Sequence, residues 1–137
     1  MITSSSNPRV KQVVQWQASA RERHSTGVFV TEGFKLFQEA PAECLKEVYI
    51  SREILDREPV SSRIWEKLEQ TGYETVSAEV FRKMSDTQTP QGILCVAGQP
   101  VYRLEQLLQA PCPLLTVLED IQDPGNLGTI FRTGEGA

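Results

Sequence analysis

The stretch LEDIQDPGNLGTIFRTGEGA, residues 118–137, decides how the end of the chain is interpreted. The apolar run at 114–118 predicts a strand, residues 120–126 a loop, and a helix is predicted from about Leu127. Asn126 is a good helix N-cap, and Gly128 stands one turn before Arg132, so we expect these two on one helix face. In open α/β sheets ligands gather beyond the carboxyl ends of strands, and arginine offers a planar fork for phosphate or carboxylate.

Two familiar phosphate loops are excluded by spacing. A Walker A loop needs Gly-Lys-Ser/Thr, whereas Gly128 is followed by Thr129 and Ile130. A dinucleotide fingerprint needs GxGxxG, which GNLGTI does not match. The residues alone therefore leave open either an anion-handling site or an ordinary capped helix with a surface arginine.

The preceding residues alternate between strand and helix patterns. Asn7-Pro8 predicts a helix start, and valines at helical spacing extend that helix to about Glu22. Strands are predicted at 28–33, 44–51, 73–77 and 93–98, and helices at 34–40, at 61–72 and just after Ser77. This alternation predicts an α/β sandwich with a largely parallel or mixed sheet. We expect a first domain at 1–99, a linker at 100–113 and an incomplete second unit at 114–137.

Composition places the chain among ordinary globular proteins. Its 137 residues are 39% hydrophobic and 23% charged, with a net charge of −4. No apolar run reaches the roughly 18 residues of a membrane span, and no signal-peptide pattern is present, which predicts a soluble, cytoplasmic protein. Cys44, Cys95 and Cys112 are too widely spaced for a zinc site or disulfide framework, and Cys95 is predicted to be buried.

Positive charge is concentrated at the N-terminus. Residues 1–24 carry Arg9, Lys11, Arg21 and Arg23 against Glu22, a balance of +3 within an acidic chain. The overall negative charge argues against binding of nucleic acid by bulk electrostatics. Two interpretations of the basic N-terminal segment are left: a local contact to phosphate, or an ordinary solvated helix face.

The residues DPGNLGTIFRTGEGA resemble the first signature motif of the SpoU (TrmH-type) RNA ribose 2′-O-methyltransferases, a family of the SPOUT class. Asn126, Gly128, Arg132 and Thr133 match that motif. Upstream, SSSNPRVKQVVQW, RHSTGVFVTEGFKLFQEA and MSDTQTPQGILCV resemble the family's N-terminal substrate-binding domain. The resemblance implies a small three-layer α/β sandwich similar to kink-turn-binding ribosomal proteins, followed by the incomplete start of a SPOUT trefoil knot.

The resemblance also implies an activity. Such enzymes transfer a methyl group from S-adenosylmethionine to a ribose 2′-hydroxyl of rRNA or tRNA, and they dimerise through the catalytic domain. The family assigns Arg132 to activating the hydroxyl and Asn126 to holding the site. Because arginine stays protonated, we expect Arg132 to clamp a phosphate and orient the hydroxyl rather than act as a free base.

The family's two later cofactor motifs are not in this sequence. We therefore expect the chain alone to bind no S-adenosylmethionine and to be catalytically inactive. It would then be a fragment or a misread reading frame, and RNA binding would be its remaining function.

The candidate RNA contacts are Arg9, Lys11, Arg21 and Arg23, the last two flanking a loop. TPQG at 89–92 is interpreted as a strand entry rather than a recognition turn, and Glu32-Gly33 as a structural turn. The alternative is a free-standing RNA- or protein-binding module without catalysis, which would have no reason to retain the Asn and Arg of the motif.

Overall fold

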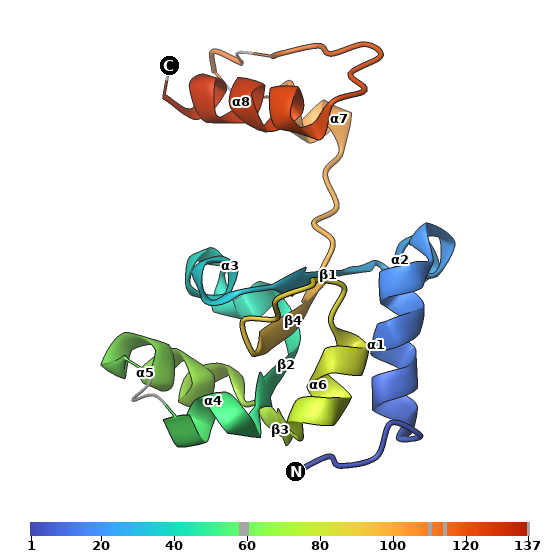
Figure 1. The fold of residues 1–137 in the computed structure, drawn as a ribbon. Coiled ribbons are helices and arrows are strands. Elements are labelled where there is room, and N and C mark those ends of the chain that lie inside the picture. The colour runs from blue at the N-terminus through green and yellow to red at the C-terminus, as the bar shows by residue number, and fades with distance from the viewer. Residues whose placement is uncertain (58–60, 110, 114, 137) are drawn as a thin grey trace. The chain divides into compact units, whose positions relative to one another are not determined.

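The computed structural model describes residues 1–57, 61–109, 111–113 and 115–136, and of Arg57 only the backbone. The chain divides into two compact units, Met1–Pro100 and Val101–Ala137, and each is described by itself (Figure 1). Within the described residues, no helix combines the length and the apolar character needed to cross a membrane.

The first unit is built on a mixed four-stranded sheet. Its elements are α1 (Pro8–Ala18), α2 (Ala20–Thr26), β1 (Val28–Glu32), α3 (Phe34–Glu39), the 3₁₀ helix η1 (Ala42–Cys44), β2 (Leu45–Ser51), α4 (Arg52–Arg57), α5 (Ser62–Thr71), β3 (Glu74–Val76), α6 (Ala78–Met84) and β4 (Ile93–Gly98). The strand order is β1-β4-β2-β3, so the last strand lies inside the sheet. Strand β4 is antiparallel to both neighbours, whereas β2 and β3 are parallel, which confirms the predicted mixed sheet.

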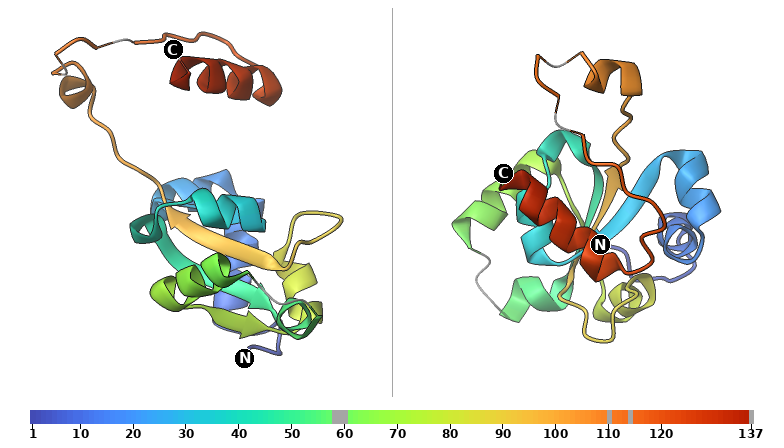
Figure 2. Two further views of the ribbon diagram at one scale, coloured as in Figure 1. Left: turned by 90° about the vertical axis from the view of Figure 1, so that its left-hand side faces the viewer. Right: turned by 90° about the horizontal axis from the view of Figure 1, so that it is seen from above.

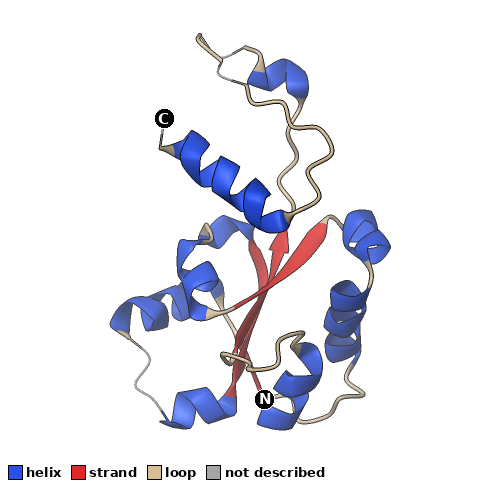
Figure 3. Ribbon diagram, turned by 45° about the horizontal axis from the view of Figure 1, so that its top comes forward, coloured by secondary structure: helices blue, strands red, loops and turns tan. Residues whose placement is uncertain are grey.

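Helices cover both faces of this sheet (Figures 2 and 3). One apolar core joins α1 and α6 to the sheet: Val10, Val13, Trp16, Val28, Tyr49, Val76, Val80, Phe81, Met84, Leu94 and Val96. A second core joins α3 and α5 to the opposite face: Phe37, Val48, Ile50, Leu68, Ile93 and Cys95. Successive residues of β4 enter opposite cores, which explains its continuous apolar run and confirms the predicted burial of Cys95.

The predicted single helix from Pro8 to about Glu22 is wrong. Ser19 adopts an extended conformation, ends α1, and caps α2 by accepting a hydrogen bond from the Glu22 N–H through its hydroxyl. A serine that bonds to the backbone in this way favours a new helix start over continuation of the old helix. Helix α2 then ends at Gly27, whose φ of 61° is the left-handed conformation typical of a helix C-terminus.

The predicted strand at 114–118 is also wrong. Leu114 lies outside the described residues, and residues 115–118 form no strand. A strand needs a partner for its backbone and a surface for its apolar side chains, and the described part of the second unit supplies neither. Val117 is accordingly 90% exposed.

The described part of the second unit contains two helices, α7 (Leu104–Leu107) and α8 (Pro124–Glu135). Helix α8 begins three residues before the predicted start at Leu127, and its N-cap is Asp123 rather than Asn126. Asp123 combines a good capping side chain with a proline at the next position, where the fixed φ of proline suits a first helical turn.

Candidate functional site

Residues 123–126 form a compact cap at the start of α8. The Asp123 carboxylate accepts the Asn126 backbone N–H at 2.7 Å. A Cβ atom on Gly125 would lie 2.9 Å from Asp123 Oδ1, so glycine lets this carboxylate approach the helix end. Asn126 therefore contributes its backbone to the cap, while its exposed side-chain amide has no hydrogen-bond partner among the described residues.

Arg132 folds back along α8 toward the same end. Its Nη2 donates to Thr129 Oγ1 at 3.3 Å, and its Nη1 lies 3.6 Å from the place that a Cβ on Gly128 would occupy. Gly128 and Arg132 thus share one helix face, as their spacing predicts. Thr133 instead donates its hydroxyl to the Thr129 carbonyl at 2.9 Å. The helix presents an exposed guanidinium with most of its donors unused.

The structure engages Arg9 in a charged cluster. Its guanidinium donates to Glu74 at 2.8 Å, lies 3.8 Å from Glu47, and stacks over the Tyr49 ring at 5.5 Å. Tyr49 in turn donates its hydroxyl to Glu47, and burial, followed by this hydrogen bond, raises the pKa of Tyr49 above its ordinary value. Two carboxylates already neutralise Arg9, which leaves it a poor phosphate ligand.

Arg21 and Arg23 do not flank a loop as predicted, because both lie in α2. Arg23 Nη1 donates to the carbonyls of Trp16 at 2.6 Å and Gln17 at 3.0 Å, which are carbonyls of the last turn of α1. This arginine therefore holds α1 against α2. Arg21 is exposed and has no ion-pair or hydrogen-bond partner among the described residues.

Lys11 lies in a groove that the sequence did not reveal. The groove has a volume of about 410 Å³ and is lined by Ser5, Val10, Lys11, Val14 and Lys83. Lys83 was missed because it stands 72 positions after Lys11 in the sequence (83 − 11), in the last turn of α6. The packing of α1 against α6 in one core is what brings the two lysines to one groove.

The Glu32 carboxylate ties the loop at 85–91 to the end of β1. It accepts hydrogen bonds from the hydroxyls of Ser85 at 2.6 Å and Thr87 at 2.9 Å, and from the Gln91 N–H at 3.2 Å. Gly33, with φ of 112°, passes so close to Gln91 that a Cβ would lie 2.9 Å from its Oε1. Glu32-Gly33 is thus a structural turn, as interpreted from the sequence.

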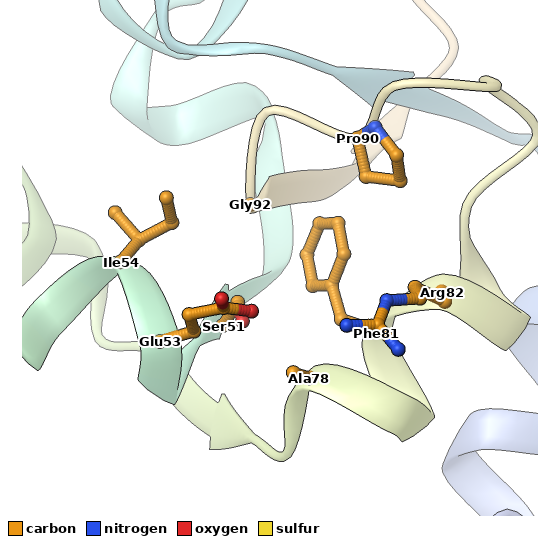
Figure 4. Close-up of a pocket in the computed structure, with 8 residues that line it drawn as sticks. All are labelled: Ser51, Glu53, Ile54, Ala78, Phe81, Arg82, Pro90 and Gly92. Atoms are coloured by element: carbon orange, nitrogen blue, oxygen red, sulfur yellow. The ribbon is translucent and has the colours of Figure 1, made fainter. Parts of the chain in front are cut away.

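A small pocket lies at the end of β2, beneath this loop (Figure 4). Its lining residues are Ser51, Glu53, Ile54, Ala78, Phe81, Arg82, Pro90 and Gly92. Its volume of about 90 Å³ is well below the roughly 300 Å³ of small-molecule sites. It is therefore a gap in the packing rather than a nucleotide site. Among the described residues, no group of His, Cys, Asp or Glu is arranged to hold a metal ion.

The chain is similar in structure to solved RNA methyltransferases. A solved structure described as an RNA 2′-O ribose methyltransferase matches with a TM-score of 0.68 and 25% identity, over 98% of this chain and 51% of that chain. A family model described as the MRM3-like substrate binding domain matches residues 7–95, and the chain belongs to this family.

Relatives named as rRNA methyltransferases have similar sequences. The chain is 35% identical to the 23S rRNA (guanosine(2553)-2′-O)-methyltransferase RlmP of Bacillus subtilis (strain 168), over 99% of the chain and 50% of that protein. It is 34% identical to the mitochondrial rRNA methyltransferase 3 of Homo sapiens, over 94% of the chain and 31% of that protein. The resemblance predicted from the motif is confirmed, and the chain spans half or less of these relatives' lengths.

Proposed function

We propose that this chain is the N-terminal portion of an enzyme that transfers a methyl group from S-adenosylmethionine to a ribose 2′-hydroxyl of RNA. The observation that carries the proposal is the family match at 7–95, followed in the same chain by Asn126, Gly128, Arg132 and Thr133 on a capped helix. In this proposal residues 1–99 bind the RNA substrate and residues 114–137 begin the catalytic domain. The relatives' names favour rRNA over tRNA.

Arg132 is proposed as the catalytic residue that holds the RNA phosphate next to the reacting ribose. Its guanidinium is exposed and keeps most of its donors free after the bond to Thr129. A permanently charged fork can fix a phosphate and orient the neighbouring hydroxyl, whereas it cannot readily accept a proton. The free amide of Asn126 is proposed to hold the local site.

S-adenosylmethionine is proposed to supply the methyl group in the whole protein, and this chain is proposed not to hold it. Most of the described large apolar side chains of the second unit lie open to solvent: Val117 and Phe131, for example, are both exposed. They form no walled site for a cofactor. Dimerisation through the remainder of the catalytic domain, a cytoplasmic location, and likeness of residues 1–99 to kink-turn-binding ribosomal proteins belong to the same proposal.

Methyl transfer by the gene product that contains this chain tests the proposal. Radiolabelled S-adenosylmethionine and rRNA are the substrates, and Arg132→Ala is compared with the wild type. We expect the variant to lose methyl transfer while keeping most of its RNA affinity. Equal loss of both would refute the catalytic role of Arg132, and RNA binding without methyl transfer by the wild type would favour the free-standing binding module.

A further inference from the structure

We propose that the groove between α1 and α6 binds the sugar–phosphate backbone of single-stranded RNA. This inference rests on the proposed function and names the surface through which the first unit contacts its substrate. The groove is lined by Ser5, Val10, Lys11, Val14 and Lys83. Phosphates lie against the two lysines, and a ribose or base lies over the valine floor.

Both lysines that line the groove are available to a ligand. Lys11 has no ion-pair partner among the described residues. Lys83 lies 3.4 Å from Glu79, but the two side chains are 53% and 80% exposed, and solvated pairs of this kind are weak enough for a phosphate to replace. Lys83 also contacts Ser5 Oγ at 3.3 Å, which brings a neutral hydroxyl into the groove.

The other basic side chains of the N-terminal segment are less suited to this task. The Arg9 guanidinium is bonded to Glu74 and faces Glu47, so RNA binding would have to break an existing pair. Arg23 donates to two main-chain carbonyls. Arg21 is exposed on α2 and does not line the groove. We therefore assign the contact to RNA to Lys11, and to Lys83 outside the N-terminal segment, rather than to the arginines.

The floor of the groove is apolar and partly open. Val10 and Val14 lie on α1, the helix that carries Lys11. Val10 is buried, whereas Val14 is 39% exposed. A volume of about 410 Å³ is within the range of sites that hold a small organic molecule, so it has room for a nucleotide. Apolar surface flanked by cations suits a nucleic-acid strand, which carries apolar base faces along a charged backbone.

The test measures binding of a short fluorescent single-stranded oligoribonucleotide to the 137-residue chain by anisotropy at several salt concentrations. The test variant is Lys11→Ala/Lys83→Ala. The matched control is Lys35→Ala/Arg63→Ala, which removes the same charge from exposed positions on α3 and α5, the helices of the opposite face. A third variant, Val14→Glu, places an anion on the groove floor.

Each phosphate contact on a single strand contributes about 0.7 to the slope of log affinity against log salt. We expect the test variant to lose about 1.4 from that slope, or about 25-fold in affinity at 0.1 M salt. The control is expected to change little, and Val14→Glu to weaken binding. Equal changes in RNA affinity and salt slope for the two double variants would overturn the assignment of the groove. That result would leave RNA binding by the chain itself unaffected.

Failure of the proposed function gives a different result. Absence of RNA binding by the wild-type chain would overturn the RNA-binding proposal and the groove together. Lysine-dependent binding of a poly-glutamate peptide without RNA binding would assign the groove to an acidic protein partner and overturn the inference. Thermal unfolding of each variant shows whether the fold is retained.

Discussion

Gly92 is the residue at which substitution by alanine is expected to destabilise the first unit most clearly. Its φ of 84° lies in the left-handed region, which costs other residues about 1–2 kcal/mol. A Cβ at this position would also lie 2.2 Å from Ile54 Cγ1, so that side chain or the backbone has to move. Overpacking of this kind costs about 1–3 kcal/mol. We expect Gly92→Ala to lower the free energy of unfolding by about 3 kcal/mol.

Gly27 provides a control for the backbone component. Its φ of 61° is also left-handed, but nothing lies within 4 Å of the Cβ that alanine would add. Gly27→Ala should therefore lower the free energy of unfolding by about 1 kcal/mol. Combining Ile54→Ala with Gly92→Ala removes the clash, and the two changes should be less harmful together than the sum of their separate effects.

Urea unfolding followed by tryptophan fluorescence measures these differences. Both tryptophans, Trp16 and Trp65, lie in the first unit, so the signal reports on that unit. Similar losses of stability for Gly92→Ala and Gly27→Ala would refute the argument from the Ile54 contact. Additive effects of Gly92→Ala and Ile54→Ala would refute it independently.

Three further predictions follow from described contacts. Lys67 donates hydrogen bonds to the carbonyls of Gln38 and Ala40 at the end of α3, so Lys67→Met should lower the free energy of unfolding by about 1–2 kcal/mol. Lys35→Met is the control and should cause no change, because among the described residues Lys35 forms only an exposed ion pair. Urea unfolding measures both variants. Because the pKa of Tyr49 is raised in the folded protein, its contribution to the free energy of unfolding is fully present below the ordinary tyrosine pKa of about 10 and is lost as the pH rises beyond it. Tyr49→Phe should therefore reduce the fall in stability measured by unfolding curves from about pH 9 to 11. An unchanged fall would contradict this assignment. Burial raises the pKa of Cys95 to about 12, so a thiol reagent should modify the exposed Cys112 in the native protein and Cys95 only after unfolding, as mass spectrometry of the labelled chain would show.

Local sequence patterns were enough to locate the four strands of the first unit and most of its helices. The apolar run of β4 and the helical spacing of Val10 and Val13 reflect burial directly, so they can be read from the sequence. The order of the strands could not be predicted, because the pairing of β1 with β4 depends on contacts between distant segments. The short helix α4 directly after β2 carries no distinctive pattern and was missed.

The errors near helix ends arise from competition between polar caps. The side chains of Ser19 and Asp123 each accept a hydrogen bond from the backbone N–H three residues ahead, and each moves a helix boundary away from its predicted place. The roles of the basic residues were equally hidden. Arg9 pairs with Glu74, which lies 65 positions away in the sequence (74 − 9). Neither the spacing of residues nor the charge of the segment shows that Arg9 binds this carboxylate rather than a phosphate.

The place of β4 at the centre of the sheet has a consequence for the protein as it leaves the ribosome. Among the described strands, β1 pairs with β4 alone, across the 70 positions that separate Val28 from Gly98 (98 − 28), and β4 also joins β1 to the β2–β3 pair. Until β4 has been synthesised, both apolar cores lack the side chains that this strand contributes to them. The first unit is therefore expected to fold late in its own translation, while the motif-bearing helix α8 is still being made.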